Sequence, residues 1–375
     1  MKRAYKFRFY PTFEQETILA QTFGCARFVY NRMLRVRSDA WYAEKKRIGY
    51  HVTFSLLTGL KKEPEFEWLN KVFSVPVQQS LRHLQAAFGN FFAKRTKYPS
   101  FKRKHDEQSA EYTSSAFKWD GRSLRLAKIK DRLNIRWSRT LSKAAKLTTA
   151  TVSKDSAGRY YVSMLCDDAV ALKPKVSGKV GIDLGLTHFA ILSRGEKIGS
   201  RNTLRKNETK LAKLQRKLSK KRKGSANRQK ARLKVARLYA SIADARKDFL
   251  DKLSTRLVNE NQVIAVAPLA VSNMKKNRCL AKSISDAGWG EFVRQLEYKS
   301  LWYGRELVGI DRWYPSSKRC SRCGHTVNKM PLNVRDWTCP ECGSLHDRDI
   351  NAVCNVLAAG LAVSALGESV SPDCI

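Results

Sequence analysis

Long hydrophobic runs are missing from this sequence of 375 residues. No apolar stretch approaches the roughly 20 residues of a membrane-spanning helix, a pattern that argues against a transmembrane protein. The N-terminal segment, MKRAYKFRFYPT, alternates in character and lacks the continuous apolar core of a secretory signal peptide. We therefore expect a protein that is neither inserted in a membrane nor secreted.

Acidic residues are scarce relative to basic ones. The chain has 33 Asp and Glu against 72 Lys and Arg, which gives a formal net charge of +39. A charge of this size indicates a polyanionic partner. Binding to a membrane surface is the competing use, but the basic residues are spread over every segment. We expect a nucleic-acid-binding protein that is long enough for two or three domains, each with its own core.

A disulfide framework is also absent. Four of the nine cysteines form two CxxC pairs, and the remaining five are scattered: Cys25, Cys166, Cys279, Cys354 and Cys374. This pattern is typical of metal binding in a reducing compartment. We expect a prokaryotic cytoplasmic protein that is located at the nucleoid.

The two CxxC pairs are the most specific motif in the chain. Cys320 and Cys323 are followed, after fifteen residues, by Cys339 and Cys342. Two such pairs supply four thiolates for a tetrahedral zinc ion, and a site with four protein ligands has no open position for catalysis. The spacing predicts a structural zinc site, with redox chemistry as the alternative.

The first half of the chain contains blocks of strand and helix patterns. Residues 4–10 alternate aromatic and basic side chains, and this period of two predicts a strand with one buried face. Helical patterns begin after Thr12, which forms a capping-box signature with Gln15, and continue to about residue 92. Strand patterns dominate residues 116–166. We expect a small barrel with the helical block inserted after its first strand.

The second half begins with GKVGIDLGL, residues 178–186, an apolar strand that carries one carboxylate, Asp183. A carboxylate between apolar neighbours is usually paired, hydrogen-bonded or bound to a metal, although capping of the following turn is the plainer alternative. A second segment, HDRDINA, places Asp349 at the start of an apolar helix. The strand and helix patterns between them include a helical hairpin at residues 204–259 and predict a mixed α/β layer. We expect Asp183 and Asp349 to meet at one edge of its sheet.

Three segments are candidates for nucleic-acid contact: the helix after Pro76, the aromatic and basic residues 92–104, and the turn region of the hairpin. A solvated helix face or a basic linker would give similar patterns. In the hairpin almost every charge is positive, which favours a polyanionic partner. The candidate residues are Gln78, Gln79, Arg82, Tyr98, Lys102, Arg103, Lys213, Arg216, Lys217, Lys220, Lys221, Arg222, Lys223 and Arg228.

These motifs together resemble the TnpB family, transposon-encoded RNA-guided endonucleases ancestral to type V CRISPR effectors. The resemblance is carried by GIDLGL, the paired CxxC motifs and HDRDINAV, and it extends over the whole chain through FRFYPT, QTFGCARFVYNRML, KYPSFKRK and LAAGLAVSALGESV. It implies a multidomain α+β protein. The implied parts are a wedge β-barrel (1–10 and 105–172), a helical recognition domain (11–104), a RuvC-like RNase H α/β domain with an inserted hairpin (178–315 and 346–375) and a zinc ribbon (316–345).

The resemblance also implies a function for each part. The wedge and recognition domains hold a guide (omega-type) noncoding RNA and recognise a short motif beside the DNA target, for which Gln78 and Gln79 are candidates. The RuvC-like domain cuts DNA with three carboxylates and two divalent ions, and Asp183 and Asp349 match the first and last carboxylates. The second carboxylate is a Glu in the pattern V-E-D-L-x-V-x-N-M. Here the same frame is VAPLAVSNM, with Ala267 in place of the Glu and Pro268 in place of the Asp.

Ala267 decides between the functional hypotheses. An alanine methyl cannot bind an ion, whereas two-metal hydrolysis needs carboxylates that hold two ions about 3.5–4 Å apart. We expect weak magnesium binding at most, and a protein similar to nuclease-dead TnpB-like repressors (TldR type), which stays bound to its DNA target and blocks transcription. A displaced acid from Glu291, Glu297 or Glu306 would instead give an active RNA-guided endonuclease of a transposon. A protein that only stabilises or matures its noncoding RNA is the third hypothesis.

Overall fold

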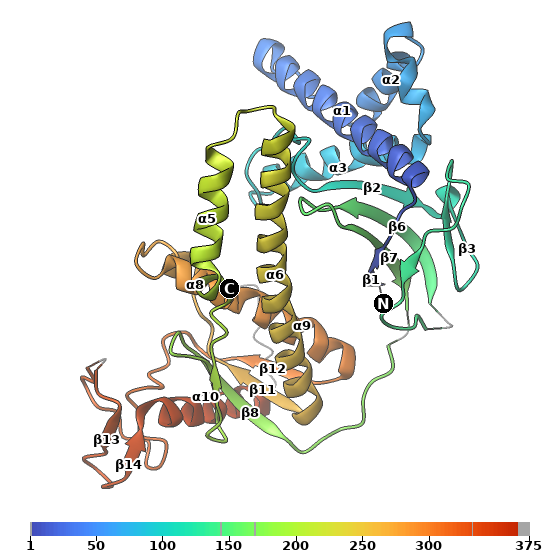
Figure 1. Ribbon diagram of the computed structural model, residues 1–375. Coiled ribbons are helices and arrows are strands. Elements are labelled where there is room, and N and C mark those ends of the chain that lie inside the picture. The colour runs from blue at the N-terminus through green and yellow to red at the C-terminus, as the bar shows by residue number, and fades with distance from the viewer. Residues whose placement is uncertain (1, 143–144, 169, 332, 367–375) are drawn as a thin grey trace. The chain divides into compact units, whose positions relative to one another are not determined.

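The structure is a computed structural model that describes residues 2–142, 145–168, 170–331 and 333–366 (Figure 1). The chain divides into two compact units, Met1–Ala169 and Val170–Ile375. Each unit has a five-stranded sheet and its own hydrophobic core. The last part of the predicted RuvC-like segment, residues 367–375, lies outside the described residues.

The first unit is built on an antiparallel sheet in the order β2-β6-β7-β1-β5. A short hairpin of β3 and β4 accompanies it. The strands are β1 (Lys2–Phe9), β2 (Gln108–Thr113), β3 (Phe117–Trp119), β4 (Leu124–Leu126), β5 (Ile135–Arg136), β6 (Lys146–Lys154) and β7 (Tyr160–Asp167). Within the residues described here, no hydrogen-bonded ladder joins the edge strands β2 and β5. Five of the strands expected for the barrel thus lie in one antiparallel sheet.

Strand β1 shows why the sequence predicted this sheet. Tyr5, Phe7 and Phe9 are buried in the core, while Lys6 and Arg8 between them are exposed. The side chains of a strand alternate between its two faces, so a period of two in the sequence becomes one apolar and one basic face. The predicted strand at residues 4–10 is confirmed, with boundaries shifted by one to two residues.

A helical block lies between β1 and β2, as predicted. Thr12 caps its first helix, and the Thr12 and Gln15 side chains form the expected capping box. The block has a separate core that includes Val29, Leu57 and Leu81. Its elements are α1 (Phe13–Glu44), α2 (Tyr50–Leu60), the 3-10 helix η1 (Pro64–Lys71) and α3 (Ser74–Phe92).

The second unit contains a mixed sheet in the order β10-β9-β8-β11-β12, in which β8, β11 and β12 are parallel. Its strands are β8 (Lys179–Leu184), β9 (His188–Leu192), β10 (Lys197–Gly199), β11 (Val263–Val266) and β12 (Glu306–Gly309). Two strands are shorter than the apolar sequence pattern indicated. The apolar sequence around them predicts strands at residues 262–269 and 306–313, but β11 ends at Val266, before Ala267, and β12 ends at Gly309.

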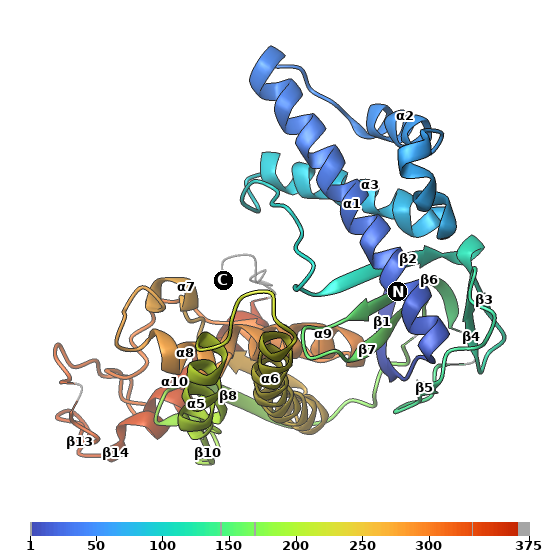
Figure 2. The same ribbon diagram turned by 45° about the horizontal axis from the view of Figure 1, so that its top comes forward.

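Helices cover both faces of this sheet. Helices α6 and α9 pack on one face, and α10 packs on the other. Helices α5 and α6 form the predicted hairpin and lie side by side in both views (Figures 1 and 2). The helices are α4 (Thr203–Lys206), α5 (Glu208–Ser219), α6 (Ala226–Glu260), α7 (Val271–Met274), α8 (Ala281–Ala287), α9 (Trp289–Tyr303) and α10 (Arg348–Ala365). Across the parts of the chain that are described, no helix has both the length and the apolar character to cross a membrane.

Two glycines allow α10 to pack directly against the sheet. A Cβ atom at Gly360 would lie 2.4 Å from the Ala265 Cβ, and one at Gly181 would lie 2.6 Å from the Val353 carbonyl oxygen. Real Cβ atoms do not approach other atoms this closely, so a side chain at either position would force the helix and the sheet apart. These contacts fix the height of α10 above β8 and β11.

We expect Gly360→Ala to destabilise the protein by about 1–3 kcal/mol, the usual cost of overpacking a core. The measurement is the urea midpoint of the full chain by circular dichroism. Gly290→Ala is a matched control, because Gly290 also lies in a helix of the second unit but a Cβ there meets nothing within 4 Å. Equal midpoints for the two variants would contradict the close packing of α10.

Candidate functional site

The face to which Asp183 points follows from the alternation of strand β8. Val180, Ile182 and Leu184 are buried in the core beneath α6 and α9. Gly181 lies on the opposite face, against α10. Because side chains of a strand alternate, the Asp183 side chain is on the α10 side of the sheet. The residue is partly buried there.

Ala267 occupies the neighbouring position on the next strand. In the parallel pairing of β8 with β11, Val266 lies opposite Ile182, so residue 267 follows in register beside Asp183. The Ala267 N–H continues the pairing with a 3.4 Å hydrogen bond to the Ile182 carbonyl. Ala267 packs with Ala265 and residues of α10. Since adjacent strands are about 4.8 Å apart, a side chain at 267 is a direct neighbour of the Asp183 side chain.

Asp349 approaches from the N-terminus of α10. The Asp347 side chain caps this helix by accepting hydrogen bonds from the backbone N–H groups of residues 349 and 350. The Asp349 carboxylate forms a 3.5 Å ion pair with Arg335, a partner that no sequence motif indicates. Asp183, Ala267 and Asp349 thus bring the first, second and third positions of the predicted carboxylate set to one face of the sheet.

The electrostatics connect the two aspartates. Burial, and then the nearby carboxylate of Asp349, raise the pKa of Asp183 to about 6, against weaker lowering by the Leu184 backbone and Arg348. A carboxylate pair of this kind is repulsive unless a cation lies between its members. The expected meeting of Asp183 and Asp349 at one edge of the sheet is therefore consistent with their electrostatic coupling.

The three candidate replacement acids occupy other places. Glu306 begins β12 opposite Val263, at the level of Lys179, which is about four residues and thus roughly 13 Å along the strands from the level of Asp183. Glu291 pairs with Arg294, and Glu297 lies further along the same helix, α9. The charged groups that shift the pKa of Asp183 are Asp349 and Arg348, and none of the three glutamates is among them.

The four predicted cysteines come together. Their Sγ atoms all lie within 4.8 Å of one another, with 3.7 Å between Cys320 and Cys342 and 3.6 Å between Cys323 and Cys339. Considering only described residues, this is the one group of three or more His, Cys, Asp or Glu side chains close enough to hold a single metal ion. Four thiols in this arrangement fit a closed tetrahedral site.

The start of helix α10 and the residues just before it contact the cysteine cluster and its first loop directly. The His346 Nε2 atom lies 3.1 Å from the Sγ atom of the first cysteine. The buried Asn351 and Asn355 side chains bond the backbone of residues 316–321, with distances of 2.6–2.9 Å. These residues were not predicted, although Asn351 belongs to the HDRDINA motif. Their contacts fix the first CxxC loop relative to Asp349.

The basic residues of the hairpin lie around the turn that joins α5 to α6, at the end of the hairpin away from the sheet (Figure 1). Most are exposed. Arg228 differs, because its guanidinium donates to the carbonyls of Leu218 and Lys221 at 3.0 and 2.8 Å. Arg228 therefore stabilises the turn, and the other basic side chains form the available surface.

The candidates in the first unit are held by local contacts. Arg82 on α3 lies over the Tyr50 ring, and Tyr98 shares a 2.7 Å hydrogen bond with Ser38. The Lys102 backbone N–H donates to Asn31 at 2.8 Å, and burial lowers the pKa of its ammonium group. The segment that could have been a loose linker is thus attached to α1.

Two further candidates, Gln78 and Gln79, are partly buried on α3. The backbone carbonyl of Arg103 accepts a hydrogen bond from the Gln108 side chain.

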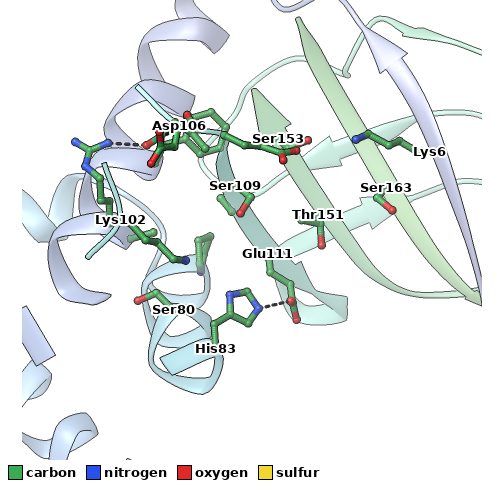
Figure 3. A pocket seen from close by; sticks show the side chains of 17 residues that line it. Lys6, Ser80, His83, Lys102, Asp106, Ser109, Glu111, Thr151, Ser153 and Ser163 are labelled. Carbon is green, nitrogen blue, oxygen red and sulfur yellow. Dashed lines mark hydrogen bonds and ion pairs between the residues drawn. The ribbon is translucent and has the colours of Figure 1, made fainter. Parts of the chain in front are cut away.

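A cavity of about 460 Å³ lies between these helices and the sheet of the first unit. Figure 3 shows His83 and Glu111 facing each other in it, with 2.8 Å between the His83 Nε2 and Glu111 Oε2 atoms. The hydrogen bond with His83 lowers the pKa of Glu111. Acidic and basic side chains both line the cavity, including Asp106 and Lys102. This mixture does not form a continuous positive tract for phosphates.

Three family models match the chain. The model described as "Probable transposase" (OrfB_IS605) matches residues 163–278. The model described as "Cas12f1-like, TNB domain" matches residues 289–356, which include the four cysteines. A helix-turn-helix model of the OrfB_IS605 group matches residues 1–46.

Curated relatives match nearly the entire chain. A protein of Streptomyces pristinaespiralis, named as an RNA-guided DNA endonuclease, is 56% identical over 374 residues, covering 100% of this chain and 93% of the relative. InsQ of Escherichia coli (strain K12), which carries the same kind of name, is 36% identical over 389 residues, covering 99% and 96%.

Among solved structures, a Cas12f1 chain from a complex with sgRNA and target DNA matches 95% of this chain and 98% of its own length. The TM-score is 0.57 and the sequence identity is 13%. At this identity the match supports the multidomain fold, including the RuvC-like and zinc-ribbon-like parts, and carries no information on activity.

Proposed function

The chain belongs to the TnpB/IS605 family of RNA-guided DNA endonucleases, and from this premise we propose that it is an RNA-guided DNA-binding protein that has lost the nuclease activity. In this proposal a guide RNA selects the target by base pairing, while the protein recognises a short flanking motif and the shape of the backbone. The protein then stays bound and represses transcription by occupying its target.

The observation that carries the proposal is the position of Ala267. It lies in register beside Asp183, on the face of the sheet that α10 covers. A methyl group there cannot bind a cation, and of the three matched positions two keep a carboxylate, one of them paired with Arg335. Two-metal hydrolysis requires ligands that hold both ions, so the residues present do not fit that chemistry.

Zinc is the metal that we assign to the cysteine cluster, because four thiolates with no open position are typical of structural zinc. The ion would hold the two CxxC loops together. Through His346, Asn351 and Asn355 it would also fix the start of α10. The proposed role is structural.

The proposed partners are a guide RNA and a double-stranded DNA target. The net charge of +39 supports polyanion binding in general, and the exposed turn of the α5–α6 hairpin concentrates charge of one sign. Phosphate contacts of this kind provide affinity without sequence specificity. Sequence specificity would come from the guide.

We expect the triple variant Lys221→Ala, Arg222→Ala and Lys223→Ala to bind guide RNA more weakly and with less salt dependence. If all three side chains contact phosphates, the slope of log affinity against log salt falls by about 2–3. Filter binding over a range of salt concentrations measures both quantities. An unchanged slope would remove the turn from the binding surface.

A control for this experiment changes the net charge equally at a different place. Lys252, Lys282 and Arg294 are exposed residues of the same unit, and each is already paired with an acidic side chain. Their triple replacement by Ala should change the salt slope less than the turn variant does. An equal effect would mean that total charge, and not the turn, governs binding.

Repression in cells tests the proposed function. The protein is expressed with its guide in a strain that carries a matching site in the promoter of a reporter gene. We expect reporter output to fall while the target DNA stays intact and the strain remains viable. Double-strand breaks at the site would support the alternative, an active endonuclease with a relocated carboxylate, and no change in output would support a role restricted to RNA maturation.

A further inference from the structure

A second cavity, of about 580 Å³, lies in the helical block of the first unit. It is formed by the C-terminal parts of α1 and α3, the chain that follows α1, and Tyr98. Its volume falls in the range of typical ligand pockets. Nine of its twelve lining residues are aromatic or basic, among them Arg37, Trp41, Lys46, Arg47, Phe88 and Phe92.

The charges in this cavity have a single sign. Arg37, Lys46 and Arg47 contribute three cations, and no Asp or Glu is among the lining residues. The cavity beside His83 differs, because both carboxylates and cations line it. Positive charge without acidic partners favours an anionic ligand.

The aromatic side chains form a partly built binding surface. Phe88 is buried, and the Arg37 guanidinium lies over its ring, 4.0 Å from the ring centroid. Arg37 also donates a 3.0 Å hydrogen bond to the Gln85 side chain. Trp41 and Phe92 remain 40% and 61% exposed. The Arg47 guanidinium lies 5.8 Å from the centroid of each of these two rings. Exposed apolar patches mark interaction sites, and aromatic residues and Arg are enriched in interfaces.

A ligand that fits both properties has a flat aromatic group next to a negative charge. An apolar protein segment would use the rings but leave three cations without partners. An isolated phosphate would use the cations but leave the rings in water. A nucleotide in a single strand satisfies both, because its base stacks on aromatic side chains and its phosphates pair with Lys and Arg.

We propose that this cavity binds an unpaired nucleobase of a single-stranded nucleic acid, stacked on Phe92, the more exposed of the two rings, with Arg47 and Lys46 at the adjacent phosphates. The inference rests on the proposed function, which supplies two sources of such strands, the guide RNA and the DNA strand displaced from the target. The shared chemistry is the base with its flanking phosphates.

The test compares Phe92→Ala with Phe13→Ala. Phe13 is an exposed aromatic residue on the same helical block, 85% exposed and outside the cavity. Fluorescent oligo-rU and oligo-dT strands of about 12 nucleotides, within the span of known single-strand sites, are titrated with the full chain. We expect Phe92→Ala to weaken binding by about 5- to 150-fold, the cost of losing one stacked base. Phe13→Ala should leave the affinity unchanged.

An abasic strand separates stacking from a structural effect. Strands with the same phosphates but without bases should bind the wild-type and Phe92→Ala proteins equally, because no base remains to stack. Arg47→Ala should weaken both kinds of strand and lower the salt slope, and Arg47→Lys should retain most of that slope. A tenfold preference for rU over dT assigns the site to the guide, and the reverse assigns it to the displaced strand.

Equal binding of base-containing strands by the wild-type and Phe92→Ala proteins would overturn the inference. So would a loss of self-association in Phe92→Ala at unchanged strand affinity, because the cavity would then be a contact between copies of the chain. Guide-dependent duplex binding by the wild-type protein is measured in parallel. If it is present while Phe92→Ala behaves as wild type in every assay, only the cavity assignment fails and the proposed function stands.

Discussion

Ala267→Glu is expected to give this protein magnesium-dependent cleavage of a guide-matched DNA duplex. Residue 267 lies in register beside Asp183, and its side chain packs on the α10 side of the sheet. Glu at this position would add the missing carboxylate to Asp183 and Asp349. Two ions could then be held for hydrolysis.

The expected gain is at least about 100-fold over wild-type background, because even the loss of an outer partner of a metal ligand costs 10- to 100-fold. Product on a denaturing gel, with and without magnesium, gives the rate. Pro268 lacks a backbone N–H at the end of β11, so the double variant Ala267→Glu, Pro268→Asp is measured as well.

Two controls make this result specific. Ala267→Gln has the size of Glu without the charge and should remain inactive. Adding Asp183→Ala to Ala267→Glu should abolish the gained cleavage. If both Glu-containing variants bind the guided duplex but never cut it, Ala267 is not the position that disables the site.

Cys320→Ser is expected to remove the metal from the cysteine cluster. Cys320 is 1% exposed, and its Sγ atom lies 3.7 Å from the Cys342 Sγ atom and 3.1 Å from the His346 Nε2 atom. A hydroxyl in its place leaves three thiolates, and structural zinc sites supply folding free energy only with a complete ligand set. Zinc content should fall from about one per chain to nearly none.

Loss of the metal should also loosen the start of α10. Asn351 and Asn355 bond the loop that carries Cys320, so their hydrogen bonds depend on its position. Hydrogen exchange should accelerate in the first turns of α10 in Cys320→Ser. Cys279→Ser, at an exposed cysteine outside the cluster, is the control and should retain zinc and slow exchange. Full zinc content in Cys320→Ser would refute the metal assignment.

Strong periodic patterns made parts of the fold predictable. The alternation in β1, the capping box at Thr12 and the apolar strand around Asp183 each express a local rule that tertiary structure did not override. The paired cysteine motifs predicted a cluster, because their spacing reflects the geometry of four ligands. Strand ends were less predictable. The apolar run after Val266 continues in sequence, while β11 and its partner β12 end together at Val266 and Gly309.

Other features depend on long-range geometry that no local pattern encodes. One example is the ion pair between Arg335 and Asp349. Another is the set of hydrogen bonds from the Asn351 and Asn355 side chains to the backbone of the first CxxC loop. Both join segments that only the fold brings together. Closure of the first sheet depends on pairing between its edge strands, which residue alternation does not specify. Similarly, a basic residue such as Arg228 looks like its neighbours in sequence, but its position directs it to backbone carbonyls.

The most direct test of the loss of cleavage is a paired measurement on the wild-type protein purified with its RNA. The RNA is sequenced and used to design a matched duplex with randomised flanks. Binding by mobility shift and cleavage with magnesium on a denaturing gel are measured in the same reactions. We predict tight, guide-dependent binding to a subset of flanks with no cut product. Cleavage that Asp183→Ala abolishes would contradict the proposal and show that another acid serves in place of residue 267.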